Sequence, residues 1–269
     1  CKSLLICVFA FMVIGVCSGV GIIRGIIASA PTIDDIVATP TGFLSTVLDA
    51  NGNQTATLVA SGSNRRAVTI DEIPKNLQYA FVAIEDERFY EHNGIDVTGI
   101  IRAGVKGVAS GFHFSEGAST ITQQLLKNTV FTSWTSESSM ADKFERKFQE
   151  QYLALQLEKV VDKDWILENY LNAINLGQNT LGVGVASERY FGKDVSDLTL
   201  SECAVLAAIT QNPSKYNPIT NPQENAKRRM KVLNNMKDQG YITQDEYDEA
   251  VADNVYDRIQ LVNIESETN

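Results

Sequence analysis

The chain has 269 residues, of which 44% are hydrophobic and 21% are charged. This is the composition of an ordinary globular protein, and it excludes a disordered or fibrous chain. Acidic residues outnumber basic ones by 33 to 23, so the formal net charge is -10, and we expect no nucleic-acid partner. The four cysteines show neither Cys-x-x-Cys nor Cys/His spacing, so we predict unpaired thiols and no structural zinc site.

The N-terminal segment is long and apolar. Residues 3–23 form a run of 21 residues without a charge, which as a helix would cover the roughly 30 Å hydrocarbon core of a bilayer. A cleaved signal peptide is the alternative, because residues 28–30 (Ala-Ser-Ala) resemble a processing site, but the apolar run is longer than a signal-peptide core. We therefore predict a transmembrane anchor over 1–30, with Lys2 on the cytoplasmic side.

The following segment, 31–72, is expected to contain a linker and a short β element. Residues 45–59 read STVLDANGNQTATLV, which is two β-prone runs around an Asn-Gly pair. Asn-Gly favours the tight turn of a two-stranded hairpin. The sequence therefore predicts a small hairpin centred on Asn51 and Gly52.

Residues 73–259 are predicted to form a mostly helical domain, because apolar residues recur there at helical spacing. Three pairs predict capping boxes that open helices: Ser139 with Asp142, Thr199 with Glu202, and Thr243 with Glu246. Gly240 is placed to end the helix before the last pair. Residues 260–269 are interpreted as a tail or as the start of a missing C-terminal domain.

The first candidate for chemistry is a run of charged and aromatic residues at 85–94. Continued as a helix, it would put Glu85, Phe89 and His92 on one flank, beside an apolar stripe. A carboxylate at the border of an apolar face is partly desolvated, which suits a general base. The alternative is a solvated acidic helix end in which Glu85 pairs with Arg88.

A second block, at 117–128, is dense in hydroxyl and amide side chains. Seven hydrogen-bonding side chains fall within ten positions: Ser119, Thr120, Thr122, Gln123, Gln124, Lys127 and Asn128. Neutral donors and acceptors suit a sugar or an N-acetyl group, and the lysine suits a phosphate. The alternative is a simple helix start, since a hydroxyl followed by glutamine can cap a helix.

A third block, at 146–150, places Arg146 and Glu150 on one side of a predicted helix, with Lys147 next to them. Two cations can stabilise a phosphate leaving group, and a carboxylate between them can tune the donor. The alternative is an ordinary ion pair between residues one turn apart, worth about 0.3–0.5 kcal/mol.

Together these blocks resemble the peptidoglycan glycosyltransferase domain of class A penicillin-binding proteins, glycosyltransferase family fifty-one. The family's ED-x-x-F-x-x-H-x-G, G-x-STITQQ-x-x-KN and R-K-x-x-E blocks match residues 85–94, 117–128 and 146–150, and ILE-x-YLN matches 166–172. One departure is Glu116, where the family usually has the first of two glycines before STITQQ. The resemblance implies a mainly α, lysozyme-like fold of two lobes around a cleft that opens at the membrane.

The resemblance also implies roles for the residues of the three blocks. Glu85 is similar in position to the general base that deprotonates the acceptor 4-hydroxyl, and Glu150 to the family's second acidic residue. Lys127, Arg146 and Lys147 match the basic residues around the donor pyrophosphate. The other residues expected to bind substrate are Asp86, Phe89, His92, Ser119, Thr120, Gln123 and Gln124. No organic cofactor is implied; a divalent cation, Mg²⁺ or Mn²⁺, at the donor pyrophosphate is allowed for without assigned ligands.

The implied substrates are lipid II and the growing glycan, which would be joined into β-1,4-linked strands with inversion at MurNAc C1 and release of polyprenyl pyrophosphate. The implied location is the bacterial cell membrane, single-pass, with the catalytic domain on the extracytoplasmic face and other cell-wall synthesis proteins as partners. No S-x-x-K or K-T-G motif is present, so we expect the N-terminal part of a bifunctional protein without its transpeptidase domain. Two alternatives stay open: a glycan-cleaving enzyme on a related fold, and a membrane-anchored, non-enzymatic scaffold.

Overall fold

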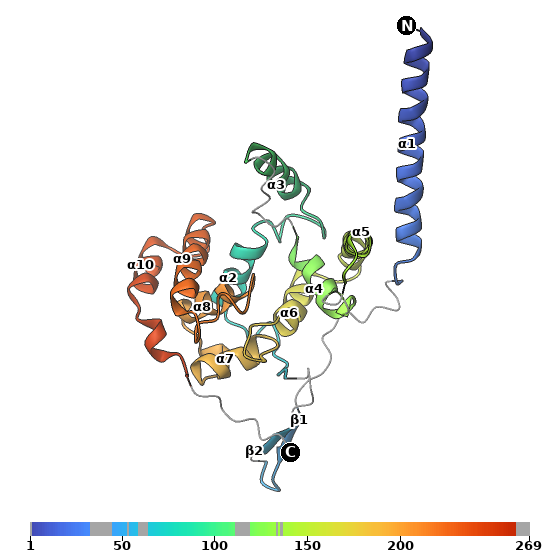
Figure 1. The fold of residues 1–269 in the computed structure, drawn as a ribbon. Coiled ribbons are helices and arrows are strands. Elements are labelled where there is room, and N and C mark those ends of the chain that lie inside the picture. Colours follow the sequence, from blue (N-terminus) through green and yellow to red (C-terminus); the bar gives the residue numbers. More distant parts are fainter. Residues whose placement is uncertain are drawn as a thin grey trace.

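The structure, a computed structural model, describes residues 2–32, 45–52, 54–58, 64–110, 119–132, 134 and 137–261. These residues are mainly helical, as the sequence predicts (Figure 1). The α-helices among them are α1 (Lys2–Ala28), α2 (Lys75–Glu85), α3 (Val97–Ala109), α4 (Ile121–Thr129), α5 (Met140–Leu157), α6 (Lys163–Ala173), α7 (Val183–Phe191), α8 (Leu200–Ile209), α9 (Pro222–Asp238) and α10 (Gln244–Ala252). Short 3₁₀ helices, η3 (Val195–Asp197) and η4 (Val255–Arg258), follow α7 and α10.

A small antiparallel hairpin precedes the helical body (Figure 1). Its strands are β1 (Ser45–Leu48) and β2 (Gln54–Leu58). In the turn between them, Gly52 has φ +83°, a conformation that glycine adopts without steric strain. The Asn51 amide donates to Asp49 Oδ1 at 2.8 Å and orders the start of the turn. The hairpin therefore lies where the Asn-Gly pair predicts it.

Helix caps follow local sequence closely. Two of the three predicted capping boxes are present as reciprocal pairs: Thr199 with Glu202 at α8 and Thr243 with Glu246 at α10. At α5, Ser139 accepts a hydrogen bond from the Ala141 amide, so among the described residues this is a serine cap rather than the predicted box with Asp142. Gly240, at φ +78°, follows the end of α9 as predicted.

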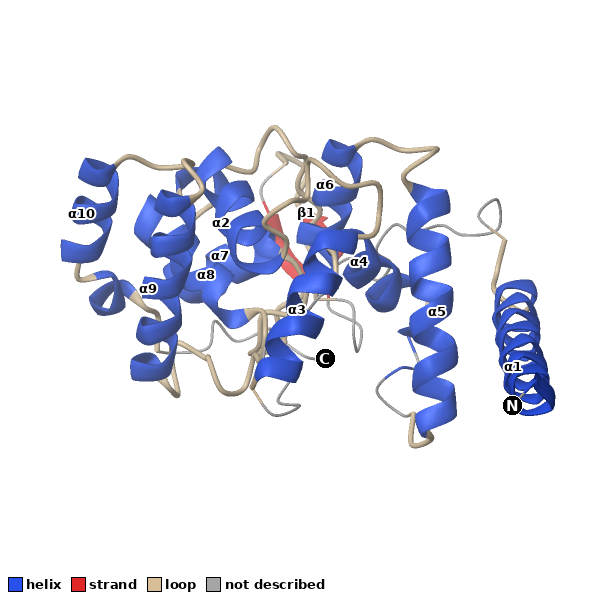
Figure 2. Ribbon diagram, turned by 90° about the horizontal axis from the view of Figure 1, so that it is seen from above, coloured by secondary structure: helices blue, strands red, loops and turns tan. Residues whose placement is uncertain are grey.

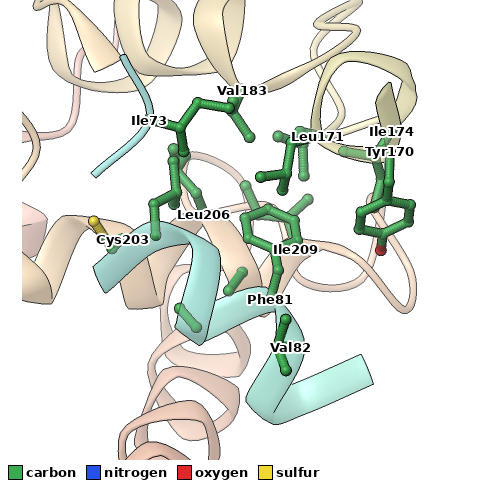
Figure 3. Close-up of a cluster of buried hydrophobic side chains, with 14 of the residues drawn as sticks. Ile73, Phe81, Val82, Tyr170, Leu171, Ile174, Val183, Cys203, Leu206 and Ile209 are labelled. Atoms are coloured by element: carbon green, nitrogen blue, oxygen red, sulfur yellow. The ribbon is translucent and has the colours of Figure 1, made fainter. Parts of the chain in front are cut away.

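The core is built around α8, whose residues 201–209 are all buried. A helix that is buried on every side has to lie at the centre of a domain. Helices α2 and α9 pack against it, while α4 packs against α6 and α5 on the other side of the body (Figure 2). Figure 3 shows Phe81 of α2 among Leu171, Leu206 and Ile209, with the free thiol of Cys203 in the same cluster.

The N-terminal helix α1 stands beside α5, away from the rest of the body (Figures 1 and 2). Contact is made near its C-terminal end, where Gln149 Nε2 donates to Ser29 Oγ at 3.1 Å and Ser29 Oγ donates to Glu145 Oε1 at 3.0 Å. In the described part of the chain, no helix combines the length and the apolar character needed to cross a membrane. The transmembrane anchor predicted over 1–30 is therefore not found there.

Some predictions fall outside the described residues. These are most of the linker at 33–44, the departure from the family at Glu116 with the start of the second block, and the tail at 262–269.

Candidate active site

Glu85 is the last residue of α2, and its carboxylate is held from three other parts of the chain. Gln124 Nε2 of α4 donates to Oε2 at 3.0 Å, and the Thr210 hydroxyl at the end of α8 donates to Oε1. Arg228 Nη2 of α9 lies 3.4 Å from the same Oε1. The Glu85 side chain is only 14% exposed, so the predicted partial desolvation of this carboxylate is confirmed.

The alternative interpretation of Glu85, an ion pair with Arg88, is wrong. Arg88 pairs with Asp96 instead, through Nε to Oδ1 at 3.2 Å and through a second contact between Nη2 and Oδ2. The predicted helical flank of Glu85, Phe89 and His92 is also wrong, because α2 ends at Glu85 and the chain turns at Asp86, with φ -155° and ψ 73°. The reason is a set of side-chain bonds made by the residues after the turn.

Asp86 and His92 form the centre of that turn. His92 Nε2 lies 3.0 Å from both carboxylate oxygens of Asp86, and the Ile121 amide at the start of α4 donates to Asp86 Oδ2 at 2.9 Å. The Gly94 amide donates to His92 Nδ1 at 3.2 Å, so Nδ1 is an acceptor and the ring proton sits on Nε2, facing Asp86. This pair fixes the end of α2 against the start of α4.

Phe89 supports the same turn from inside the core. It is fully buried and meets the His92 ring edge-on, with 6.3 Å between ring centroids. The Lys163 ammonium lies 4.5 Å from the Phe89 ring centroid on another side. The structure thus places Phe89 in the core, as packing for the turn, rather than on a surface that a substrate would touch.

The second block forms the start of α4. Its residues fit both the helix-capping and the ligand-binding interpretation. Thr120 caps the helix by accepting from the Gln123 amide at 3.2 Å, and its hydroxyl donates to Gly94 O at 2.7 Å. Ser119 Oγ and Gln123 Oε1 both accept from Lys147 Nζ of α5, at 2.8 and 3.2 Å. Gln123 Nε2 is buried without a hydrogen-bond partner in the described residues. The block is therefore a capped helix start that also carries unused donors.

Glu150 of α5 is surrounded by cations. Its side chain is 1% exposed, with Lys147 Nζ at 3.0 Å from Oε2 and Arg146 in contact with Oε1. Arg146 Nε also donates to both oxygens of Glu137, at 2.8 and 3.0 Å. Burial lowers the pKa of Arg146, but its bonds to Glu137 and the charge of Glu150 outweigh this and raise the pKa overall. The two cations predicted beside Glu150 are therefore in contact with it, and the carboxylate between them is buried, unlike that of an ordinary surface ion pair.

Lys127 completes this cation cluster from α4. Its ammonium lies 4.5 Å from the Trp134 ring centroid. Burial lowers the pKa of Lys127, opposed by the charge of Glu150 and reinforced by the charges of Lys147 and Arg146. An anion bound here would raise the pKa of Lys127 again, because it would favour the charged form of the lysine.

The two halves of the site meet on α4. Gln124 faces Glu85, and its neighbour Gln123 faces Lys147. A cleft of about 470 Å³ opens on the Glu85 side, bounded by α2, α3, α4 and α9, and reaches Ser119. The structure therefore brings the predicted site residues together as a carboxylate at one end and a cation cluster at the other.

Three residues of the Glu85 environment were missed by sequence reasoning: Tyr170, Thr210 and Arg228. Tyr170 of α6 is fully buried and its hydroxyl lies 3.3 Å from Gln124 Oε1, which orients the amide toward Glu85. Burial, with the charge of Glu85 next in size, raises the pKa of Tyr170 well above its usual value, so the phenol keeps its proton. The only sequence signal for Tyr170 was its position in the ILE-x-YLN block.

The described residues contain no cluster of three or more His, Cys, Asp or Glu side chains that could hold a metal ion. Near the cation cluster, the carboxylates of Glu150 and Glu137 are already engaged by Arg146 and Lys147. The described residues thus offer no protein ligand set for the divalent cation that was allowed for at the donor pyrophosphate, and we assign no step to it.

Comparison with known proteins places these residues in a family. The sequence model described as Transglycosylase matches residues 51–237. Penicillin-binding protein 1A of Clostridium perfringens (strain 13 / Type A) is 43% identical over 237 residues, which are 85% of this chain and 34% of that protein. Penicillin-binding protein 1A of Escherichia coli (strain K12) is 40% identical over 244 residues, covering 89% of this chain and 28% of that protein.

A solved structure, penicillin-binding protein 1A from Haemophilus influenzae, aligns with a TM-score of 0.46 at 23% identity, covering 85% of this chain and 22% of that one. The chain thus spans about a third or less of the length of these relatives. The family match covers well over half of the chain and contains every residue of the site described above. The chain belongs to the transglycosylase family, as a peptidoglycan glycosyltransferase domain of the class A penicillin-binding proteins.

Proposed function

We propose that this domain polymerises lipid II into β-1,4-linked glycan strands, with inversion at MurNAc C1 and release of polyprenyl pyrophosphate. The observation that carries the proposal is that α4 joins a carboxylate and a cation cluster. Gln124 of this helix bonds the mostly buried Glu85, its neighbour Gln123 bonds Lys147 beside Arg146, and Lys127 of the same helix feels the charges of both ends. A displacement reaction with an anionic leaving group needs a base for the attacking hydroxyl and cations that stabilise the leaving group.

In the proposed reaction, Glu85 removes the proton of the acceptor 4-hydroxyl, and that oxygen attacks C1 of the donor sugar. The bond from C1 to the pyrophosphate oxygen breaks, and a single displacement inverts the configuration at C1. Gln124 and Thr210 donate to the Glu85 carboxylate and aim it at the acceptor. The cation cluster stabilises the negative charge that develops on the pyrophosphate, because hydrogen bonds between charged groups are stronger than those between neutral groups.

A glycan-cleaving enzyme is the second candidate. It would use an acidic residue in a sugar cleft but has no anionic leaving group for three clustered cations to stabilise. The test is to incubate the purified chain with labelled lipid II in detergent and, separately, with purified sacculi. Glycan ladders from lipid II are expected, and release of muropeptides from sacculi without ladders would overturn the proposal.

Alanine at Arg146 or Lys147 is expected to reduce use of the donor by about 100-fold in kcat/KM, because each cation contributes roughly 2–3 kcal/mol to pyrophosphate charge. Acceptor binding should change far less. The measurement compares elongation at varied concentrations of a preformed glycan donor and of lipid II acceptor. Lys143→Ala, an exposed lysine on the same helix, is the control, and equal loss at both subsites would contradict the pyrophosphate role.

We also propose that the domain works on the extracytoplasmic face of the bacterial cell membrane, with α3 lying on the lipid surface. This helix exposes Val97, Ile101, Val105 and Val108, each 60–65% exposed. Arg102 and Lys106 share the same helix. An apolar face flanked by basic residues is typical of a helix that lies in the membrane interface, and a lipid-linked substrate would be delivered there.

Val105→Asp is expected to weaken binding of the domain to vesicles of mixed anionic and neutral phospholipid by at least fivefold, because it puts a charge into the apolar face. Val160→Asp is a matched control, since Val160 is also 65% exposed but lies after α5, away from α3. Co-sedimentation with vesicles measures both. Equal binding by the two variants would refute the role of α3.

Because this chain aligns with only 34% and 28% of the length of these relatives, we propose that it corresponds to the glycosyltransferase part of a bifunctional penicillin-binding protein. Transpeptidation and contacts with other cell-wall synthesis proteins would then depend on parts outside this sequence.

A further inference from the structure

A second polar cavity, of about 380 Å³, lies between the turn after α6 and the loop after α8. Its lining residues are Asn175, Gly177, Gln178, Asn179, Leu181, Pro213, Ser214, Asn217 and Thr220. None of these side chains is charged, and most carry an amide or a hydroxyl. The volume falls in the roughly 300–1,000 Å³ range of small-molecule sites.

The turn that forms one wall is held in an unusual conformation. Gly177, Gln178 and Asn179 have φ values of +78°, +49° and +56°, so three successive residues are left-handed and two of them are not glycine. The turn is closed by the Thr180 hydroxyl, which donates to Gly177 O at 2.6 Å, and by the Gly177 amide, which donates to Asn175 Oδ1 at 2.9 Å. Strain of this kind is kept mostly where a side chain must be presented to a ligand.

The opposite wall contains an amide with unused donors. Asn217 is 4% exposed, and its Oδ1 accepts from the Ile219 and Thr220 amides at 2.8 and 3.1 Å. These bonds fix the orientation of the side chain, so Nδ2 points the other way. A β-carbon placed on Gly177 would lie 3.5 Å from that Nδ2, which puts it beside the strained turn. Nδ2 makes no hydrogen bond in the described part of the chain and is not one of its sealed, unpartnered atoms, so this donor is open to the solvent of the cavity.

One short segment of chain contributes to both sites: Thr210 bonds Glu85, Gln211 lines the cleft, and Pro213 with Ser214 lines the second cavity. The two sets of lining residues have no member in common.

We propose that this cavity binds one N-acetylated sugar unit of a glycan strand, with Asn217 Nδ2 donating to a sugar or acetamido oxygen. The choice of a glycan rests on the proposed function. Neutral amides and hydroxyls match the donors and acceptors of such a sugar, whereas a peptide stem with free carboxylates would require a cation, and no lining residue supplies one. Holding a strand here would raise its effective concentration at the reacting centre between additions.

The test uses a soluble tetramer of β-1,4-linked N-acetylglucosamine, titrated into the purified chain by calorimetry. Asn217→Asp keeps the acceptor for Ile219 and Thr220 but removes both donors, and we expect at least a tenfold weaker affinity. Asn254→Asp adds the same charge at an exposed position outside both cavities and should bind like the wild type.

Unchanged affinity of a folded Asn217→Asp variant, or no binding by the wild type, would overturn the inference. If Asn217→Asp does not fold, Asn179→Gly takes its place, because Asn179 is exposed and glycine accepts its positive φ; unchanged affinity of that variant would then count against the site. Lipid II polymerisation is measured in parallel. Ladders without tetramer binding overturn this inference alone, and tetramer binding that depends on Asn217 without ladders overturns the proposed function alone.

Discussion

Glu85→Gln is expected to lower the rate of lipid II polymerisation by about 10³-fold while the protein stays folded. Positioned general bases contribute roughly 10²–10⁴-fold to rate, and an amide cannot accept the proton of the acceptor hydroxyl. The amide oxygen can still accept from Thr210, but the amide nitrogen then faces the donor Gln124 Nε2, so we expect the unfolding free energy to fall by about 1–3 kcal/mol. The measurement is the initial rate of glycan formation, with a urea melt on the same sample.

Glu91→Gln is the matched control for this substitution. Glu91 lies six positions further along the same block and is exposed, and it does not line the cleft. Its variant should polymerise lipid II at close to the wild-type rate. Near-normal activity of a folded Glu85→Gln variant would refute the assignment of Glu85 as the base, and an inactive wild type that still binds lipid II would favour the scaffold interpretation.

Asp86→Ala is expected to lower the free energy of unfolding by about 3 kcal/mol. The substitution leaves His92 Nε2 and the Ile121 amide without the acceptor that both use, and a buried donor without a partner costs roughly 1–3 kcal/mol. Because Asp86 ties the end of α2 to the start of α4, the contact between Gln124 and Glu85 should loosen as well. Polymerisation should therefore fall even at temperatures where the variant is folded.

The comparison for stability is Glu224→Ala, which removes a carboxylate from a surface ion pair with Lys227. Such pairs contribute about 0–1 kcal/mol. Denaturant unfolding at neutral pH, with equal m-values, separates the two variants. A loss for Asp86→Ala no larger than that for Glu224→Ala would show that the Asp86–His92 contact does not hold the turn in place.

The sequence could predict most of the residues that make up the candidate site. It could predict much less about what each residue contacts and does. Glu85, Lys127 and Glu150 are found from short blocks because their chemical types and spacings are local properties of the sequence. The partners of Glu85 are not local: Thr210 lies 125 positions away and Arg228 lies 143 positions away. No periodicity within a block reports contacts that only the packing of α8 and α9 against α2 creates.

The error at 85–94 has a definite physical source. Helical periodicity was extended through a segment that has no helix-breaking residue before Gly94. The structure ends α2 at Glu85 because the Asp86 carboxylate gains bonds from His92 and from the Ile121 amide, which a continued helix would not allow. Tertiary contacts of a buried charge outweigh the propensity of a few residues, which amounts to less than 1 kcal/mol each.

The sequence by itself determined the helical class of this protein, its hairpin turn, two of its capping boxes and the family to which its blocks belong, because these depend on residues within a few positions of one another. Only the tertiary structure decided that Phe89 supports the turn from within the core, that Glu150 is buried among cations, and that α4 connects the carboxylate to the cation cluster. It also revealed the cavity beside Asn217, whose walls come from the loop between α6 and α7 and the loop between α8 and α9. Burial and pairing of charged groups depend on which distant elements exclude water around them, and that is fixed only when the whole core is assembled.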